Sequence, residues 1–346
     1  MGVNGILLLD KDEGWTSQDC VSKLRGILGE RRIGHAGTLD PLATGLLVVL
    51  VGRATRAAAF AEAETKEYVA AFRPGIVTDT QDITGNVLRS SDVLLTEEDV
   101  RKALPRFTGE IEQIPPMYSA IKINGQKLCD VARRGGDVER TARRITIHSI
   151  DFLGQERGDY LLRIRCSKGT YIRTLCHDLG EYLGCGGCMA ALRRTRSGSF
   201  SVENARRIAD LTRADRDTLL PVDTLFSAAA ALTLTAAQEK RCRCGNPFRT
   251  GAPDGATRFY SESGEFLAIG QFECHLLALG GADIGNRLNG SKEFIFALCR
   301  IGAIYFNRYA LFGRCPTDVF DDEIDNGIAG IIACIGIRYV GDLEIG

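Results

Sequence analysis

A twelve-residue block that runs directly into an apolar segment limits most strongly how this chain can fold. The block is Gly34-His-Ala-Gly-Thr-Leu-Asp-Pro-Leu-Ala-Thr-Gly45, and the apolar segment is 46–51. Its glycines permit backbone angles that other residues avoid, and Pro41 stiffens the turn that presents Asp40. This combination before a buried strand predicts an active-site loop. The alternative is an ordinary Asp-Pro turn in which Asp40 bonds only its own backbone.

The pattern of apolar residues in the first two thirds of the chain predicts an α+β fold. Helical spacing after Ser17 predicts a helix, and Thr96 with Asp99 forms a capping box that predicts another. Four further segments predict strands; the first two are continuously apolar and buried, and the last two alternate and expose one face. These segments are 6–9, 46–51, 68–72 and 160–166.

The length of 346 residues exceeds the usual size of one domain, so we expect a large domain and a smaller appended unit. The boundary is expected before an Ala-rich stretch, which gives a catalytic domain over 1–227. A turn signal at Gly245-Asn-Pro247 and a strand-turn-strand pattern over 257–269 predict a small β-rich unit over 228–281. Residues 282–346 carry no motif that predicts a structure.

The formal net charge of −1 does not by itself indicate nucleic-acid binding, but its distribution is informative. Residues 281–346 hold six Lys and Arg against nine Asp and Glu, a balance of −3, which leaves +2 on residues 1–280. Two arginine clusters in that part could neutralise phosphates, and solvated basic faces are the alternative. The clusters are Arg133, Arg134, Arg140, Arg143 and Arg144, and Arg193, Arg194 and Arg196.

The twelve cysteines are scattered over a chain with no visible secretory signal, which favours reduced thiols and a cytoplasmic location. No apolar run reaches the roughly 20 residues that a membrane span needs, so no membrane partner is expected. A structural zinc on Cys185, Cys188, Cys242 and Cys244 is the alternative, but the spacing of the second pair is unusual for zinc. The sequence therefore predicts no metal.

The Gly34–Gly45 block resembles the nucleophile motif of the TruB-type tRNA pseudouridine-55 synthases, and further motifs follow in that family's order. The resemblance covers about residues 4–226 and continues weakly to about residue 272, in a unit similar to a PUA module. It implies a pseudouridine synthase fold, with a mixed, mainly antiparallel sheet flanked by helices and loops. The further motifs are Asp10-Lys11 with Gly14-Trp-Thr-Ser17, Lys66-Glu-Tyr68, Thr78-Asp-Thr-Gln-Asp82 with Gly85, the segment 113–122 with Gly125 and Ala132-Arg133, Gly169-Thr-Tyr-Ile-Arg173, and Leu192-Arg-Arg194.

Three positions beside these motifs depart from the family's pattern. Asp12 stands where a proline is usual, Pro74 where a leucine is usual, and Cys129 where a tyrosine is usual. None of them is the nucleophile, so they put RNA contacts in doubt more than catalysis.

The resemblance implies three catalytic residues. Asp40 attacks either the sugar carbon or the uracil ring of an extruded uridine, which is covalent catalysis. Arg173 is expected to grip the Asp40 carboxylate with two nitrogens and to favour its ionised form. Tyr68 is expected to stack on the target base and to take part in proton transfer from the sugar. The alternatives are a structural ion pair elsewhere for Arg173 and an ordinary strand aromatic for Tyr68.

The resemblance also implies a set of substrate-binding residues. One histidine lies near the extruded base, a tyrosine and a leucine line the uracil pocket, and three basic residues bind RNA. Two of these basic residues belong to an expected RNA-clamping insertion over 115–144, for which a flexible basic hairpin is the alternative. Core packing is the alternative for the first three. The residues are His35, Tyr171, Leu192, Lys11, Arg133 and Arg134.

As a whole, the resemblance implies a monomeric isomerase that acts on the T loop of tRNA. It needs no cofactor, metal or protein partner, and the PUA-like unit adds shape-based RNA contacts. Two other interpretations stay open at this point. One is a guide-RNA-dependent pseudouridine synthase of the same fold, and the other is a noncatalytic RNA-binding or RNA-folding protein.

Overall fold

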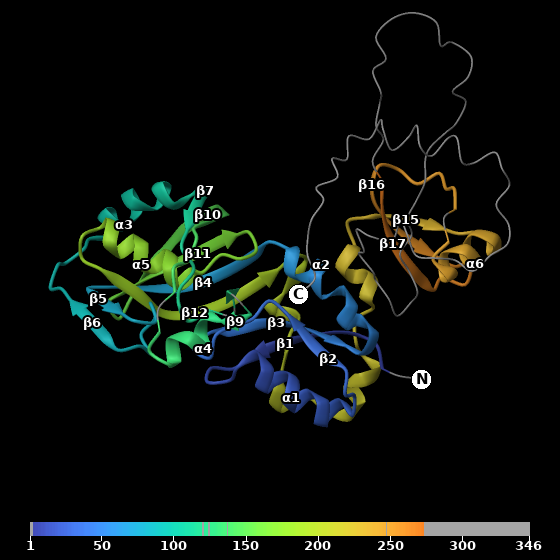
Figure 1. The fold of residues 1–346 in the computed structure, drawn as a ribbon, viewed down its shortest axis with the longest axis horizontal. Helices are drawn as coiled ribbons and strands as arrows, with labels where there is room; N and C mark the ends of the chain where they lie inside the picture. The colour runs from blue at the N-terminus through green and yellow to red at the C-terminus, as the bar shows by residue number, and fades with distance from the viewer. Residues whose placement is uncertain (1–2, 120, 124, 137, 247, 273–346) are drawn as a thin grey trace, which may run out of the picture. The chain divides into compact units, whose positions relative to one another are not determined.

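The described residues up to 227 fold around one long mixed β-sheet (Figure 1). A computed structural model describes residues 3–119, 121–123, 125–136, 138–246 and 248–272. In this part of the chain the sheet has ten strands, eight of them in the order β14-β1-β3-β12-β4-β11-β10-β7. They are β14 (Arg206–Arg207), β1 (Gly5–Lys11), β3 (Thr44–Val51), β12 (Gly187–Ser197), β4 (Lys66–Pro74), β11 (Asp159–Cys166), β10 (Arg143–Glu156) and β7 (Gly109–Gln113), with β2 (Ile33–Ala36) on β3 and β13 (Phe200–Ser201) on β12.

Most neighbouring strands of this sheet run antiparallel, which confirms the predicted fold class; β1 with β14 and β3 with β12 run parallel. The β3–β12 join is short, with Thr44 opposite Arg193 and Gly45 opposite Arg194. Gly45 has a φ of +95°, and a Cβ atom there would lie 2.3 Å from the Arg194 carbonyl oxygen. Only glycine fits at this join.

Capping boxes begin three of the α-helices in the described part of the chain. In α1 (Ser17–Leu28) the box is formed by Thr16 and Asp19, which leaves the Ser17 side chain free for another contact. The box predicted at Thr96 begins α3 (Glu97–Ala103), as expected. The other helices are α2 (Ala58–Ala63), α4 (Leu128–Arg133), α5 (Ile172–Tyr182) and α6 (Ala236–Cys244), and the 3-10 helices are Gly52–Ala57, Leu104–Phe107, Val202–Asn204, Ile208–Asp210, Arg213–Asp217 and Val222–Phe226.

β1 and β3 are buried on both faces, which explains why their sequences are continuously apolar. Successive residues of a strand point to opposite faces, so the two strands contribute to two different cores. The larger core takes Leu7, Leu9 and Leu47 and also contains the apolar residues of α1 and α5. The smaller core takes Ile6 and Leu8 on the other face. The prediction of buried strands at 6–9 and 46–51 is confirmed.

The two alternating strands differ in how well their outer faces are covered. β11 has the predicted pattern, because its inner residues are buried while Arg163 and Arg165 are exposed. β4 lies between β12 and β11. Its inner residues, among them Tyr68, are buried, and its outer face is partly covered rather than open. The outer face of β4 is partly covered because the strand lies in the centre of the sheet. The local sequence does not reveal this central position.

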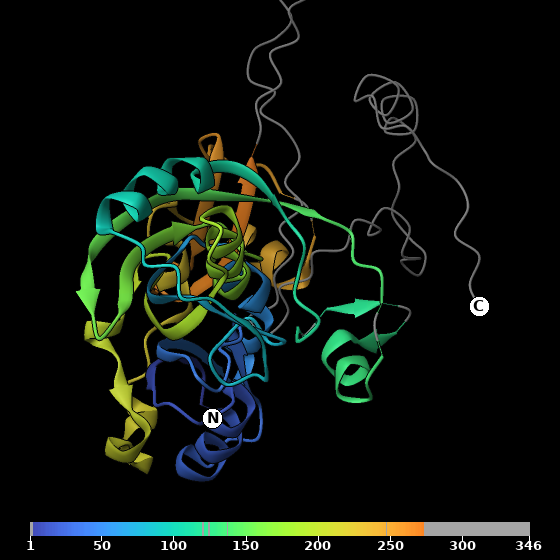
Figure 2. The ribbon, with the colours of Figure 1, turned by 90° about the vertical axis from the view of Figure 1, so that its left-hand side faces the viewer.

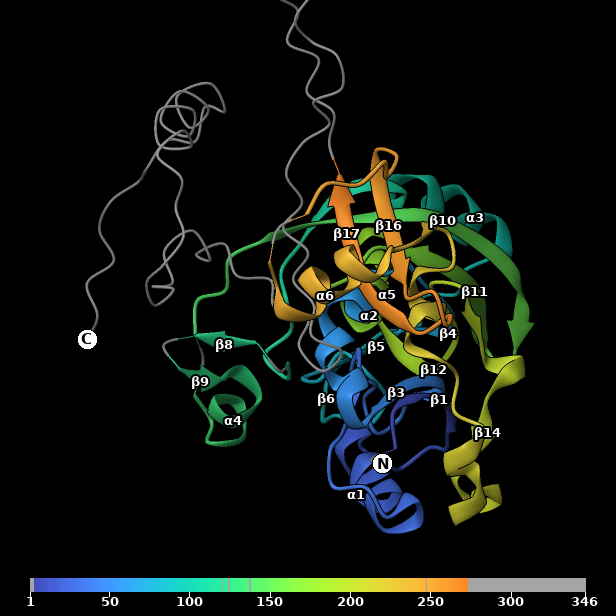
Figure 3. The same ribbon diagram turned by 90° about the vertical axis from the view of Figure 1, so that its right-hand side faces the viewer.

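The described residues between β7 and β10 include a lobe that stands away from the sheet in Figures 2 and 3. The predicted insertion over 115–144 contains this lobe and the first two residues of β10, Arg143 and Arg144, which pair with β7. Its described part contains the hairpin β8 (Lys122–Ile123) and β9 (Gln126–Lys127), followed by α4. Another hairpin, β5 (Ile76–Thr78) and β6 (Val87–Ser90), leaves β4 and carries a loop over 79–86. The loop over 79–86 and the segment before β8 each bring a backbone carbonyl to the site described below.

The described residues after 227 include a second, smaller sheet with its own core. β15 (Ala230–Thr233) pairs in parallel with β16 (Gly255–Tyr260), which pairs antiparallel with β17 (Phe266–Phe272). The strand-turn-strand pattern expected over 257–269 is therefore confirmed. This core contains Cys242 of α6 and Phe259 of β16, both fully buried. Residues 273–281 of the expected unit and the segment 282–346 lie outside the described residues.

None of the helices in the described part of the chain has the length and apolar character that a bilayer span requires.

Candidate active site

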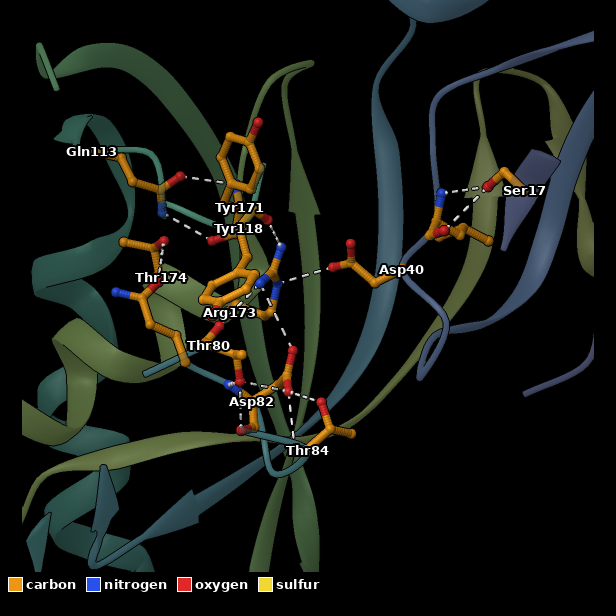
Figure 4. A network of polar contacts seen from close by, with 12 residues as sticks. Ser17, Asp40, Thr80, Asp82, Thr84, Gln113, Tyr118, Tyr171, Arg173 and Thr174 are labelled. Carbon is orange, nitrogen blue, oxygen red and sulfur yellow. Dashed lines mark hydrogen bonds and ion pairs between the residues drawn. The ribbon is translucent and has the colours of Figure 1, made fainter. Parts of the chain in front are cut away.

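Asp40 and Arg173 face one another at the centre of the polar network in Figure 4. Asp40 lies in the loop between β2 and β3, and Arg173 lies in the first turn of α5. The Arg173 Nε atom is 2.9 Å from the Asp40 Oδ2 atom. The Arg173 side chain is 5% exposed, whereas the Asp40 side chain is 38% exposed. A buried cation thus holds a carboxylate that solvent, and therefore a substrate, can reach.

The guanidinium of Arg173 does not form the two-nitrogen grip that was expected from the sequence. Its Nη1 donates to the Thr80 carbonyl oxygen at 2.9 Å, and its Nη2 donates to the Tyr118 carbonyl oxygen at 2.8 Å. Nη1 also lies 3.8 Å from the Asp82 Oδ2 atom. Backbone carbonyls from both hairpin regions therefore occupy the two outer nitrogens, and Nε serves Asp40.

Asp82 lies in a tight turn beside this guanidinium. Its Oδ1 atom accepts hydrogen bonds from Thr80 Oγ1 at 2.9 Å, from the Thr84 backbone N–H at 3.0 Å and from Thr84 Oγ1 at 2.5 Å. Gln81 within the turn has a φ of +62°, which is uncommon for a residue other than glycine. Sequence analysis gave Asp82 no role. The available signal was the Thr-Gln-Asp-Ile-Thr spacing, because short polar side chains at such intervals favour this kind of turn.

The environment of Asp40 raises its pKa above the usual value. Burial is the largest cause, the charge of Arg173 opposes it, and the charge of Asp82 adds to the rise. The positive charge of Lys11 has a smaller lowering effect. The charge of Arg173 lowers the Asp40 pKa, as expected, but burial raises this pKa by more.

Ser17 fixes the loop immediately before Asp40. Its hydroxyl accepts a hydrogen bond from the Leu39 backbone N–H at 2.9 Å and donates one to the Leu39 carbonyl oxygen at 3.1 Å (Figure 4). The Ser17 residue is 2% exposed. One buried hydroxyl therefore satisfies both backbone groups of a loop residue, which sequence analysis did not foresee.

Lys11 braces the same loop from the end of β1. Its side chain is buried, and its Nζ donates to the carbonyl oxygens of Asp12 at 2.9 Å, Trp15 at 2.7 Å and Pro41 at 3.4 Å. Burial lowers the Lys11 pKa, while the charges of nearby acids, including Asp40, act in the opposite direction. The expected role of Lys11 in RNA binding stays a prediction, and the structure shows its Nζ donating to carbonyl oxygens inside the protein.

Tyr68 is buried on β4, directly opposite Arg194 in the pairing of β4 with β12. Burial raises the pKa of the Tyr68 phenol, while the charge of Arg194 and a hydrogen bond with it act to lower this pKa. The negative charge of Asp40 is close enough to raise the same pKa. The phenol therefore lies within electrostatic reach of both the carboxylate and a buried guanidinium.

The second arginine cluster expected from the sequence does not form a uniform basic surface. Arg194 is 1% exposed and does not reach a phosphate. Arg193 is bonded through Nη1 and Nη2 to the two carboxylate oxygens of Asp10 at 3.0 and 2.9 Å. Arg196 is exposed. Alternation along β12 separates these neighbours, which a count of charges cannot show.

The three residues expected near the uracil occupy different surroundings. His35 on β2 is partly exposed, and burial together with the charge of Arg194 lowers its pKa, which favours the neutral imidazole. Tyr171 caps α5, with its backbone N–H donating to Gln113 Oε1 at 2.8 Å and its carbonyl accepting from Gln113 Nε2 at 3.0 Å. Burial raises the pKa of the Tyr171 phenol, and the charge of Asp40 adds to the rise. Leu192 lies in the larger core at 9% exposure.

Arg133 and Arg134 are exposed at the end of α4 in the lobe. Arg133 Nη1 lies 3.3 Å from Asp130 Oδ1, a pair in which both side chains are exposed and which contributes little. Both arginines are thus accessible to a phosphate.

The three departures from the family pattern make contacts of their own. Asp12 Oδ1 lies 3.5 Å from an Arg207 nitrogen on β14. Pro74 ends β4 opposite Gly187. The Cys129 backbone N–H donates to the Ser119 carbonyl oxygen at 3.1 Å inside the lobe. Asp12 therefore makes an ion pair that proline cannot make.

Among the described residues, no group of three or more His, Cys, Asp or Glu side chains could hold a metal ion. The four cysteines considered as zinc ligands are free thiols. Burial raises the pKa of Cys188 and of Cys242 to about 11. The described residues therefore give the zinc alternative no support.

The comparisons with known proteins place this fold in the class of pseudouridylate synthases. The family model of the TruB family pseudouridylate synthase N-terminal domain matches residues 25–172. The family model of the tRNA pseudouridylate synthase B C-terminal domain matches residues 173–227. The chain belongs to the TruB family, which confirms the resemblance.

Curated relatives cover most of the chain. A tRNA pseudouridine synthase B of Aromatoleum aromaticum is 44% identical over 276 residues, which span 78% of this chain and 89% of that protein. One of Pseudomonas aeruginosa is 41% identical over 281 residues, spanning 78% and 92%. Among solved structures, a chain of a Cbf5-Nop10-Gar1 complex aligns over 78% of both chains, with a TM-score of 0.60 and 26% identity.

Proposed function

We propose that this chain is an isomerase that converts a uridine in the T loop of tRNA, at position 55, into pseudouridine, with Asp40 as the nucleophile. The bond between the ribose carbon C1′ and the uracil nitrogen N1 breaks, and a bond between C1′ and the uracil carbon C5 forms. C5 loses a proton and N1 gains one. No atom or electron is added overall, so the reaction needs a nucleophile and proton transfer but no redox group.

One observation carries the proposal. The Asp40 carboxylate is open to solvent on one side and is held on the other by Arg173, which backbone carbonyls fix in place. A nucleophile must be both positioned and reachable. Covalent attack by a carboxylate divides one difficult step into two easier ones. The curated relatives align with about four fifths of this chain, and their names support tRNA as the substrate.

The other residues take roles that their places support. Tyr68, within electrostatic reach of Asp40, stacks on the extruded base and takes part in proton transfer. Tyr171 borders the uracil pocket, and the partly exposed His35 contacts the swung-out nucleotide. Leu192 closes the pocket only if the base reaches the edge of the larger core, so its role rests on the resemblance alone. Enzymes that act on a base hold it against such apolar and aromatic faces.

The RNA contacts lie outside this centre. Arg133 and Arg134 are exposed on the lobe and are placed to neutralise phosphates of the T loop. We assign residues 1–227 to a catalytic domain, 115–144 to an RNA-clamping insertion and 228–281 to a PUA-like unit. The segment 282–346 receives no role.

The enzyme is proposed to act alone, as a monomer in the cytoplasm, where its substrate is found. A guide-RNA-dependent enzyme is the second candidate, because the aligned solved structure is a complex with further proteins. Identity to the tRNA enzymes is higher, at 44% against 26%, which favours the first. A noncatalytic RNA-binding protein would not require a carboxylate paired with a buried arginine.

The experiment incubates the purified chain with a tRNA transcript that lacks modifications and maps pseudouridine along it. We expect one pseudouridine, in the T loop. The matched variant is Asp40→Asn, which keeps the shape of the side chain and removes its nucleophilic charge. It should form no pseudouridine while binding the transcript as tightly as the unaltered chain. Turnover by that variant, or a requirement for an added guide RNA, contradicts the proposal.

A further inference from the structure

Arg194 is a buried guanidinium that no carboxylate neutralises within the described part of the chain. Its exposure is 1%, and it is the largest fully buried side chain. Burying a charge is costly unless it is paired or hydrogen-bonded, and most buried arginines meet an Asp or Glu. The other buried arginine among the described residues follows that rule, since Arg173 pairs with Asp40. Retaining an unneutralised charge at Arg194 calls for an explanation.

Backbone carbonyls hold the Arg194 guanidinium on two sides. Nε donates to the Leu46 carbonyl oxygen at 2.6 Å, and Nη2 donates to the Gly37 carbonyl oxygen at 3.0 Å. Gly37 precedes Asp40 and Leu46 follows it, so the guanidinium joins the two ends of the catalytic loop. Two directed bonds to fixed backbone groups leave the side chain little freedom to move.

The charge held at this point acts on the side chains around it. Tyr68 lies directly opposite Arg194 in the pairing of β4 with β12, so the two side chains project from the same face of the sheet. Burial raises the Tyr68 pKa, and the charge of Arg194 opposes that rise. On the same inner face of β4, Lys66 is also buried, and burial together with the charge of Arg194 lowers the Lys66 pKa to about 8. The other charged or titratable groups that act on Lys66 are Glu64, Cys166 and Glu62. Those that act on Tyr68 are Cys166 and Asp40.

We propose that Arg194 is a positioning residue that acts through Tyr68, by fixing the phenol beside the catalytic loop and by stabilising negative charge on its oxygen. The inference rests on the function proposed above, in which Tyr68 takes part in proton transfer. A phenol that gives up a proton becomes negative, and the buried surroundings of Tyr68 oppose that change. A nearby fixed cation without a carboxylate of its own is the arrangement that offsets it.

A double-mutant cycle tests the inference. Arg194→Met removes the charge and keeps most of the volume, and Tyr68→Phe removes the phenolic oxygen and keeps the ring. Under single-turnover conditions we expect Arg194→Met to slow pseudouridine formation by about tenfold or more, with unchanged RNA affinity. In the Tyr68→Phe background, the same substitution should cost no more than about twofold, because the two residues act as a unit.

Arg73→Met is the matched control, since Arg73 lies on β4 and its partner Asp159 is buried. We expect it to lower the melting temperature without coupling to Tyr68→Phe. Equal losses from Arg194→Met in both backgrounds would mean that Arg194 only supports the fold, and the inference would be wrong. If Arg194→Met does not fold, the cycle is run with Arg194→Gln, which also removes the charge and keeps a polar group for the backbone carbonyls, and the same outcomes decide.

Failure of this inference is distinct from failure of the proposed function. Activity of the unaltered chain and its loss in Asp40→Asn test the function, without reference to Arg194. The cycle then tests only whether Arg194 works through Tyr68.

Discussion

Replacing Ser17 by alanine should disable the catalytic loop without altering any residue that touches the substrate. The Ser17 hydroxyl makes one hydrogen bond to each backbone polar group of Leu39, the residue before Asp40. Both residues are buried, at 2% and 3% exposure. Ser17→Ala therefore leaves a buried N–H and a buried carbonyl without this partner.

The magnitude follows from these two bonds. A net hydrogen bond contributes about 1 kcal/mol, and an unsatisfied buried group costs about 1–3 kcal/mol, so we expect the free energy of unfolding to fall by about 2–4 kcal/mol. The loop can recover part of this loss by moving Leu39 toward water. That movement displaces the Asp40 carboxylate, and a shift of about 1 Å at a reacting group costs about a hundredfold in rate.

The assay compares Ser17→Ala with Ser22→Ala, which makes the same change at an exposed position of α1. We expect Ser17→Ala to lower the single-turnover rate by about tenfold to a hundredfold, with RNA affinity within about twofold of normal. Ser22→Ala should change neither. A rate within about twofold of normal, together with the expected fall in stability, would refute the argument that Ser17 positions the nucleophile.

Two further predictions concern the charges around the site. Asp82→Asn removes a negative charge that raises the Asp40 pKa, so this pKa should fall. The rate is expected to drop at the pH where Asp40 becomes protonated, and that pH should therefore be lower in the variant. A pH profile of the single-turnover rate checks this, and a shift to higher pH would contradict it. Charge reversal at Arg133 and Arg134 should weaken RNA binding and make the slope of log affinity against log salt less steep by about 1–2. Reversal at the exposed Lys102 on α3 is the control. An unchanged slope for the double variant would remove both arginines from the interface.

The sequence predicted those parts of the fold and site that depend on local pattern. Apolar runs revealed the buried strands β1 and β3, and the Thr96 capping box revealed α3. The resemblance to the family also predicted the pairing of Asp40 with Arg173, which the structure contains. In each case neighbours along the chain, or a shared family pattern, contain the necessary information.

The parts that the sequence did not predict depend on contacts between distant segments. Lys11 and Arg194 are charged residues that pattern alone assigns to the surface, yet the sheet buries both and turns their donors toward backbone carbonyls. Ser17 meets Leu39 only because α1 packs beside the loop. The outer nitrogens of Arg173 are taken by carbonyls that no side-chain pattern encodes.

The close approach of Gly45 to Arg194 makes this enzyme vulnerable at a place where no chemistry occurs. A methyl group at position 45 would meet a carbonyl oxygen at 2.3 Å and force β3 away from β12. The same displacement pulls Arg194 off Leu46 and alters the setting of Asp40. A screen of random variants for lost activity should therefore recover substitutions at Gly45 as readily as substitutions of the nucleophile, and most of those proteins will still contain every reactive group.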